Sequence, residues 1–357
     1  MSLFNTAMMT GGGIFPGIVL GSYVNADVFL YDASKIYLCS NGTVSSTAQF
    51  IPPITPGTLT SFDILGETGY TTTTSGAVYK TTDGGNNFYY LNTLSPFSGT
   101  GDVILGPFLK LSPSGYIYIA TSIQIGAPYF YSGATFFSSN GGSSYIKGTT
   151  PSYLGNPGTI IDTFGYRNIL TVPSNSTMFF NYSSTAIAKS SNSGLTSTVV
   201  WDGYTLFGTQ TTPYAINAYD TNYVYASGDL NDTIDAVIYS TDGTNFNIFT
   251  GVTYPQASTD IASQGQNKAF IGSNKATSGK NYFTLDNQVT MNTYATLATI
   301  TKKVQSIQFN KLDKQKGYIF GVTAGDTGVL YKTTDGGTNY SQILTTSENN
   351  LTIVTKS

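Results

Sequence analysis

The sequence has no histidine, a single arginine (Arg167) and a single cysteine (Cys39) in 357 residues. Nucleophilic sites of the serine–histidine and cysteine–histidine kinds need an imidazole base, so the sequence excludes both. Structural and catalytic zinc sites draw on sets of cysteine and histidine, which this chain cannot supply. Cys39 also has no partner for an internal disulfide. We therefore expect neither a metal centre nor a cofactor.

Charged residues are scarce as well, at 10% of the chain, against about 25% in an ordinary soluble domain. The net charge is −3, so there is no basic field to hold nucleic acid or an anionic membrane. A hydrophobic content of 40% is enough for a core, which excludes a disordered protein. Because a protein with few ion pairs loses little when its carboxylates are protonated, we expect unusual stability in acid.

No lysine or arginine precedes Lys35, so there is no recognisable signal peptide. The apolar stretch 14–20 is too short, and too interrupted by glycine and proline, to be inserted across a membrane. Residues 1–13 are apolar and end in three glycines, which favours a flexible arm ahead of a single domain, 14–357. Such an arm could dock on a neighbouring subunit or pack beside the run 351–356. The composition favours an extracellular protein, whereas the start is that of an unprocessed chain. A virion protein satisfies both, and so does a chain whose signal has been removed.

A short turn motif recurs along the chain: Ser or Thr, then Asp or Asn, then Gly, then an aromatic residue. Its two closest copies lie in the nearly identical stretches VYKTTDGGNNF and LYKTTDGGTNY. The four sharp copies consist of Thr81, Asp83, Gly85 and Phe88; Ser138, Asn140, Gly142 and Tyr145; Ser240, Asp242, Gly243 and Phe246; and Thr333, Asp335, Gly337 and Tyr340. Weaker copies surround Asn41, Asn192 and Asp286.

The acidic or amide position of the motif sets the period of the repeat. It falls at residues 41, 83, 140, 192, 242, 286 and 335, a mean spacing of about 49 residues. Seven units of that length account for almost the whole chain. Repeats of roughly 40 to 50 residues, each with four short strands, are typical of propeller blades. We predict an all-β fold, a seven-bladed β-propeller with about four antiparallel strands per blade.

Each unit contains further runs of β-branched and aromatic residues bounded by Gly, Ser, Asn or Asp, as short strands do. No stretch combines helical periodicity with helix caps. The runs predicted to begin blades are GIVLGSY (17–23), FDILGE (62–67), DVILGP (102–107), TIIDTFG (159–165), YAINAYD (214–220) and SIQFN (306–310).

The turn motif has a physical logic. An Asp or Asn at a hairpin bend accepts hydrogen bonds from backbone N–H groups that follow it, and glycine supplies a positive φ. In these features the chain resembles the Asp-box (BNR) repeat family, which includes sialidases, sortilin-like receptors, certain glycoside hydrolases and photosystem assembly factors. The resemblance implies a propeller whose boxes join the two outer strands of a blade. It implies a structural role for the box residues and little about function.

Enzymatic activities of that family can be tested on the residues. A sialidase clamps its substrate carboxylate with three arginines, so Arg167 alone excludes this chemistry. A glycoside hydrolase needs two carboxylates that face each other across a cleft. Aspartates near predicted blade starts offer candidates, although turns and strand ends favour aspartate for structural reasons. The candidates are Asp63, Asp102, Asp162, Asp220 and Asp260.

Asp229, Asn231, Thr233 and Asp235 place oxygens at alternate positions, as calcium loops do. The stretch lacks the turn glycine and the terminal bidentate glutamate of such loops. We therefore interpret it as a polar hairpin between two strands of one blade.

By elimination, we expect a non-enzymatic binding or structural protein at a virion surface or in an extracellular setting. Its role there would be that of a spike, turret or attachment propeller, and its partners would be protein subunits of a larger assembly or host surface glycans. Two alternatives stay open: a secreted or cell-surface carbohydrate-binding propeller, and a glycoside hydrolase with an unrecognised pair of aspartates.

Overall fold

The structure is a computed structural model of the chain. It describes residues 25–40, 42–55, 58–94, 103–125, 130–150, 169–182, 186–203, 205, 211–230, 234–249, 258–273, 282–286, 290–293, 297 and 299–357. Every named element in these ranges is a β-strand, and helical conformation is assigned only at the single positions Gly203, Thr205 and Leu297. None of the described segments is a helix of the length and hydropathy needed to span a membrane.

The strands form separate antiparallel sheets, and each sheet is built almost entirely from consecutive strands. The six four-stranded sheets are β29 (Thr352–Thr355) with β1 (Val28–Tyr31), β2 (Ile36–Ser40) and β3 (Thr43–Thr47); β9 (Val103–Leu111), β10 (Ile117–Ile125), β11 (Phe130–Ser138) and β12 (Ile146–Gly148); β13 (Leu170–Thr171), β14 (Met178–Tyr182), β15 (Ala186–Ser190) and β16 (Thr198–Asp202); β17 (Thr211–Ala218), β18 (Val224–Leu230), β19 (Ile234–Ser240) and β20 (Phe246–Phe249); β21 (Ser258–Gly265), β22 (Lys268–Ser273), β23 (Tyr282–Asp286) and β24 (Thr290–Thr293); and β25 (Lys303–Phe309), β26 (Gly317–Val322), β27 (Gly328–Thr333) and β28 (Ser341–Thr346).

One further sheet has five strands. It comprises β5 (Leu59–Leu65), β6 (Thr68–Thr73), β7 (Ala77–Thr81) and β8 (Asn87–Thr93), with β4 (Gln49–Ile51) added parallel to β8 at its outer edge. Phe50 of β4 stacks on Phe88 of β8 with ring centroids 5.1 Å apart. This added strand covers backbone groups that an edge strand would otherwise leave unpaired.

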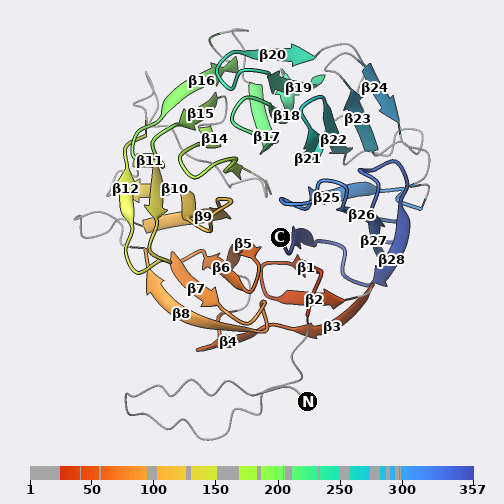
Figure 1. The fold of residues 1–357 in the computed structure, drawn as a ribbon, viewed down its shortest axis with the longest axis horizontal. Coiled ribbons are helices and arrows are strands. Elements are labelled where there is room, and N and C mark those ends of the chain that lie inside the picture. The colour runs from red at the N-terminus through yellow and green to blue at the C-terminus, as the bar shows by residue number, and fades with distance from the viewer. Residues whose placement is uncertain are drawn as a thin grey trace, which may run out of the picture.

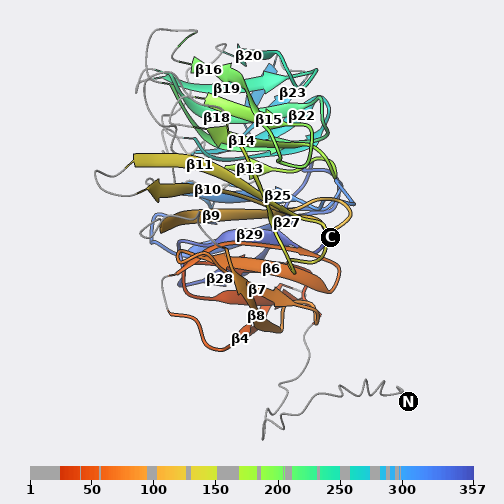
Figure 2. The ribbon, with the colours of Figure 1, turned by 90° about the vertical axis from the view of Figure 1, so that its left-hand side faces the viewer.

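The sheets surround a central axis, which identifies the fold as a β-propeller (Figure 1). The innermost strand of each sheet is the first of its strands in the sequence, except in the sheet of β1, where it is the C-terminal strand β29. The innermost strands of successive sheets contact one another. In the view turned by 90°, the strands run across the thickness of the ring (Figure 2). The prediction of seven blades of about four strands each is wrong as stated. The structure has six four-stranded blades, and the remaining sheet has five strands because β4 crosses over from the preceding blade.

The ring is closed by the C-terminal strand. Thr352–Thr355 pairs antiparallel with Val28–Tyr31 and takes the innermost place in the sheet of β1. The run GIVLGSY (17–23), predicted to begin the first blade, and the proposed arm, 1–13, lie outside the described residues. TIIDTFG (159–165) also lies outside them, and the strand found before β14 is Leu170–Thr171.

The core lies between blades. Two strands in the middle of their sheets, Met178–Tyr182 and Gly317–Val322, are buried along their whole length. Both faces of each sheet are covered by neighbouring sheets, which explains apolar runs without strict alternation. Aromatic rings contribute much of this packing; Phe62, for example, makes edge-to-face contacts with Phe29 and Phe88.

Candidate functional site at the axial pocket

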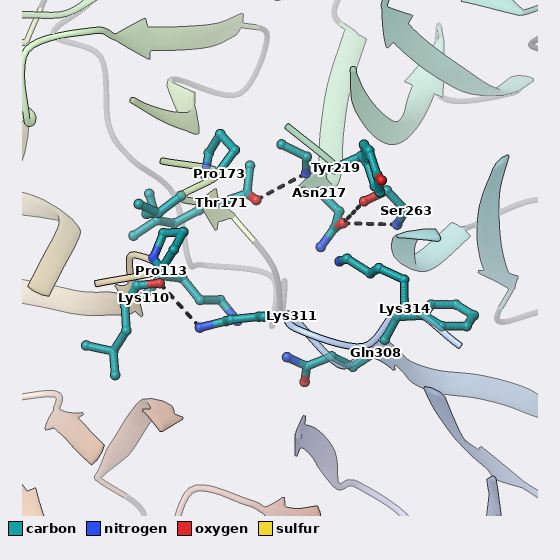
Figure 3. A pocket seen from close by; sticks show the side chains of 15 residues that line it. Lys110, Pro113, Thr171, Pro173, Asn217, Tyr219, Ser263, Gln308, Lys311 and Lys314 are labelled. Atoms are coloured by element: carbon teal, nitrogen blue, oxygen red, sulfur yellow. Dashed lines mark hydrogen bonds between the residues drawn. The ribbon is translucent and has the colours of Figure 1, made fainter. Parts of the chain in front are cut away.

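A cavity of about 110 Å³ lies where the innermost strands of five successive blades end near the axis (Figure 3). We call it the axial pocket. Each innermost strand delivers residues to it from its last positions or from the turn that follows, so side chains from distant repeats meet at one place. The polar lining residues are Lys110, Thr171, Asn217, Ser263, Gln308, Lys311 and Lys314, and the rim includes Pro113, Pro173 and Tyr219.

Three lysines dominate the charge of the axial pocket. Lys311 follows β25, and its ammonium group lies 2.5 Å from Asp63 Oδ2 on β5. It also donates a hydrogen bond to the Leu111 carbonyl at 3.3 Å. Asp63 is fully buried, whereas a quarter of the Lys311 side chain is exposed. Lys311 therefore bridges the blades of β25, β5 and β9 across the axis.

Lys110 and Lys314 have no carboxylate within ion-pair distance among the described residues, whose ion pairs involve four other lysines. Burial lowers the pKa of Lys110, Asp63 opposes this shift, Lys311 adds to it, and Asp260 opposes it. Burial, followed by repulsion from Lys311, lowers the pKa of Lys314 to about 8. The pocket therefore holds ammonium groups that are incompletely neutralised and partly removed from water.

The two innermost-strand aspartates, Asp63 and Asp260, join neighbouring blades. Asp63 accepts hydrogen bonds from the backbone N–H of Leu111 at 2.7 Å and of Ile64 at 3.1 Å. Asp260 accepts hydrogen bonds from the N–H of Ile307 at 2.8 Å and of Ile261 at 2.9 Å. Both side chains are fully buried. Each carboxylate thus satisfies backbone donors of its own strand and of the next innermost strand.

The same link recurs around the axis with other side chains. In each case a polar side chain on one innermost strand accepts a hydrogen bond from a backbone N–H 46 to 48 residues later, at 2.7 to 3.2 Å. The acceptor and donor residues are Ser61 and Leu109, Asp63 and Leu111, Thr171 and Ala218, Asn217 and Ser263, Asp260 and Ile307, and Ser306 and Ile353. The separation matches one repeat, so this inter-blade link is part of the repeat itself.

Of the other aspartates proposed for a hydrolase pair, only Asp220 lies within the described residues. Asp220 lies in the turn after β17, where its carboxylate accepts hydrogen bonds from the N–H groups of Asn222 and Tyr223 at 2.8 and 2.9 Å. Asp102 and Asp162 lie outside the described residues. Among the described members of the set, each carboxylate has a structural role in its own place.

The predicted turn motifs lie at the opposite, outer edge of the blades. The stretch from Thr81 to Phe88 joins β7 to β8, the two outer strands predicted to be linked by the box. The Thr81 hydroxyl donates to Asp83 Oδ1 at 2.8 Å and accepts from the N–H of Gly85 at 3.1 Å. Asp83 in turn accepts from the N–H of Asn87 at 2.9 Å. Gly85 has a φ of +88°, and a Cβ there would lie 2.7 Å from the Phe29 ring of the preceding blade.

The other sharp copies have the same geometry. The hydroxyl groups of Ser138, Ser240 and Thr333 each donate a hydrogen bond to the Oδ1 atom of the residue two positions later. These acceptors are Asn140, Asp242 and Asp335. Gly142, Gly243 and Gly337 each donate to that hydroxyl at 2.9 to 3.0 Å. The three turns join β11 to β12, β19 to β20 and β27 to β28, and their aromatic positions are Tyr145, Phe246 and Tyr340.

Hydrogen bonds also lower the pKa of aspartates in these turns. Bonds from the N–H and side chain of Asn245 hold the pKa of Asp242 far below its usual range. Corresponding bonds from Asn339, followed by the Thr333 hydroxyl, lower the pKa of Asp335 to about 2. These shifts arise from local backbone geometry and not from a ligand site.

The calcium-like spacing forms the hairpin between β18 and β19, where Asp229 pairs with Asp235 in the strand register. Asn231 and Thr233 lie outside the described residues. Within the described ranges, no group of three potential metal-ligating acids, cysteines or histidines comes together.

Sequence reasoning missed the three lysines of the axial pocket. Lys311 and Lys314 stand in the stretch NKLDKQK, a charge-dense run in a chain with few charges, and Lys110 follows the predicted strand DVILGP. Their position at the ends of innermost strands was the available signal. Their convergence depends on ring closure, which the sequence pattern does not specify.

Comparison with known proteins places the fold and nothing finer. No family model matches the chain, and no curated protein matches it. Among solved structures, the chain is similar to YCF48 bound to D1 peptide, with a TM-score of 0.53, 12% identity and 80% of each chain covered. It is also similar to the GH74 xyloglucanase from Xanthomonas campestris, with a TM-score of 0.60, 14% identity and coverage of 80% of this chain and 45% of that one. A third similar structure is the GH74 enzyme of Niastella koreensis, with a TM-score of 0.55, 16% identity and coverage of 80% of this chain and 45% of that one. The chain thus spans less than half the length of the two enzymes, and at these identities the likeness shows a shared β-propeller fold.

Proposed function

We propose that this chain is a non-enzymatic propeller that binds a partner through the end of the ring on which the axial pocket opens. The pocket brings lysines, polar side chains and a rim of proline and tyrosine together from five blades. Concave sites with a few convergent polar groups are the usual place for a ligand.

The observation that supports a non-enzymatic function is that Asp63 and Asp260 are both engaged in hydrogen bonds with the backbone. A glycoside hydrolase needs one carboxylate to donate or accept a proton and a second to act as nucleophile or base. Here each carboxylate accepts two backbone hydrogen bonds, and Asp63 also pairs with Lys311. Carboxylates held in this way are acceptors that fix neighbouring strands, so they favour a structural role.

The setting of the protein follows from composition. A chain with 10% charged residues and a surface rich in Ser, Thr, Asn and Tyr suits an environment outside the cell. We propose a surface position, on a virion or otherwise extracellular, with glycans or protein subunits as partners. The hydroxyl–acid–glycine geometry of the outer turns supports the related proposal that these turns are Asp boxes.

The rival function is glycan hydrolysis, since GH74 enzymes are among the structures of similar fold. Propellers of this fold also include one bound to a peptide, so fold does not choose between the two functions. The arrangement of Asp63 and Asp260 favours binding.

A direct test incubates the full chain with xyloglucan and a panel of neutral and acidic polysaccharides and measures new reducing ends, alongside binding to the same glycans on an array. We expect binding without turnover. Turnover by wild-type protein that disappears in Asp260→Asn or Asp220→Asn, both still folded by circular dichroism, would overturn the proposal.

A further inference from the structure

Two of the three lysines that line the axial pocket have no ion-pair partner among the described residues. Lys110, Lys311 and Lys314 contribute three ammonium groups, and the carboxylates that act on them are Asp63 and Asp260. The neighbouring Asp313 pairs with Lys316 at 3.0 Å on the exposed side of the same loop and does not line the pocket. Lys110 and Lys314 are therefore the two pocket lysines without an ion pair among the described groups. An uncompensated charge that is partly removed from water raises the free energy of the folded protein unless an anion joins it.

Resting on the proposed binding function, we propose that the axial pocket binds a carboxylate group of its partner, with Lys314 and Lys110 as the charged contacts. A carboxylate has two acceptor oxygens and no donor, so it can accept hydrogen bonds from both lysines. Lysine suits this role because it acts as a point charge that accepts varied approach directions.

The polar wall of the pocket supports an anion in the same place. The Oδ1 atom of Asn217 accepts hydrogen bonds from the N–H and hydroxyl of Ser263, at 3.0 and 2.5 Å. These two donors fix the amide orientation, so the NH₂ group of Asn217, a lining residue, is the end left to donate. In the view of Figure 3 the side chains of Asn217 and Lys314 point into the same space, with Lys311 below. An ammonium group and an amide NH₂ that face one space make a set of hydrogen-bond donors for an anion.

The size and rim of the pocket restrict how the carboxylate is presented. A space of about 110 Å³ holds a small group and not a whole saccharide or peptide. The rim residues Pro113, Pro173 and Tyr219 offer apolar faces, and Tyr219 is 37% exposed. The carboxylate therefore enters the pocket while the ring or side chain that bears it packs on the rim. A uronic acid of a glycan and the C-terminal residue of a peptide share this chemistry.

The lowered pKa of Lys314 gives the site a signature that a structural role would not produce. At pH 8.5 most Lys314 in the free protein is neutral, because its pKa is about 8. A bound carboxylate stabilises the ammonium form and raises this pKa, so binding at pH 8.5 takes up a proton. Affinity should consequently fall as the pH rises from 7 to 9.5.

The experiment uses the full chain and isothermal titration calorimetry at pH 7. Glucuronate is compared with glucose, and N-acetylleucine with N-acetylleucinamide, so that each acid has a neutral partner and the two arms separate glycan from peptide sources. We expect one or both acids to bind and neither neutral partner to do so. At pH 8.5, titrations in buffers of different ionisation enthalpy should show proton uptake on binding.

The variants Lys314→Gln and Lys110→Gln should each weaken binding about tenfold or more, the loss expected for one charge-assisted contact. Lys316→Gln is the matched control, because Lys316 is an exposed lysine two positions from Lys314 that does not line the pocket. It should bind as the wild type does.

Absence of binding by either acid, equal binding of an acid and its neutral partner, or equal losses in Lys314→Gln and Lys316→Gln would overturn the carboxylate site. Proton uptake is measured on the wild type and does not depend on how the variants fold. A failure here with no turnover of polysaccharides leaves the non-enzymatic proposal standing, whereas turnover would overturn that proposal whatever the acids do.

Discussion

Aspartates at the inner edge of the blades link neighbouring blades, whereas those at the outer edge stabilise a single turn. Near the axis, Asp63 and Asp260 accept backbone hydrogen bonds from residues 47 or 48 positions away, in the next blade. At the outer edge, Asp83 and Asp335 accept them from residues four positions away, in the same turn. The inner pair is fully buried, and the outer carboxylates lie at or near the surface.

The chemistry is the same in both places, and the sequence separation makes the difference. A local bond stabilises one hairpin as soon as that hairpin forms. A hydrogen bond between blades forms only after an entire repeat has folded and docked on its neighbour, so it stabilises the assembled ring. The outer turns should therefore act one at a time, and the inner links should couple neighbouring blades.

The largest effect is expected at the inner edge. Asp63→Ala leaves the N–H of Leu111 and the Lys311 ammonium without their buried acceptor. Removing one partner of a buried pair destabilises a protein by about 3 to 5 kcal/mol. Urea unfolding monitored by tryptophan fluorescence should show this loss in the free energy of unfolding.

Asp313→Ala is the control for that measurement, because it breaks an ion pair in which both side chains are about half exposed. Exposed pairs contribute roughly 0 to 1 kcal/mol. If the two variants lost similar stability, the contrast between buried inter-blade links and surface pairs would be wrong.

A smaller effect is expected at the outer edge. Asp83→Ala removes the acceptor for the Thr81 hydroxyl and the N–H of Asn87, and we expect a loss of about 1 to 3 kcal/mol. Asp83→Asn should lose less, because Asn140 fills the equivalent place in another blade and still accepts from the N–H of Ser144 at 3.1 Å. Binding should be unchanged in both variants while they remain folded. Full stability with lost binding would contradict a structural role for this turn.

The same distinction explains what could be predicted from the sequence. The turns are local, so their residues and spacing predicted the repeat and the outer hairpins directly. The added strand Gln49–Ile51 pairs in parallel with a strand of the next blade, and the closing strand Thr352–Thr355 pairs with the start of the chain. Neither pairing leaves a local signal. The short strand Leu170–Thr171 has too few residues to show a pattern.

The candidate site was hidden for the same reason. Asp63 and Asp260 could be singled out as aspartates near blade starts, but their hydrogen bonds to the next blade depend on the register between sheets. Lys110 and Lys311 are about 200 residues apart in sequence and meet only because the ring closes. The sequence pattern predicts the strands and turns within one repeat, but it does not predict which side chains of different repeats meet at the axial pocket.

Acid should separate the two edges further. Carboxylates with depressed pKa values contribute stability that is present above the unfolded pKa and is lost as the pH falls through the folded pKa. For Asp335 this window runs from about 4 down to about 2. At pH 3 the outer turns therefore keep part of their contribution, and there is no histidine to become charged. We expect the thermal midpoint at pH 3 to lie within about 5 °C of that at pH 7. A much larger fall would contradict the expected tolerance of acid.

The smallest effect is expected on the alkaline side, at Lys314. The folded protein holds this lysine with a pKa of about 8, against 10.5 for an ordinary lysine. Between these values the unfolded chain binds more protons, so stability should rise as the pH increases from 8 toward 9.5. Burial raises the pKa of Cys39 to about 12, so its opposing effect begins near pH 9, whereas the same rise for Tyr37 and Tyr318 acts only above about pH 10. The contribution of Lys314 is therefore the difference in slope between the wild type and Lys314→Gln. Lys314→Gln should flatten the rise, and Lys316→Gln should keep it, in urea unfolding at pH 7.5, 8.5 and 9.5. An identical slope in wild type and Lys314→Gln would show that burial and repulsion from Lys311 do not disfavour the ammonium form of Lys314.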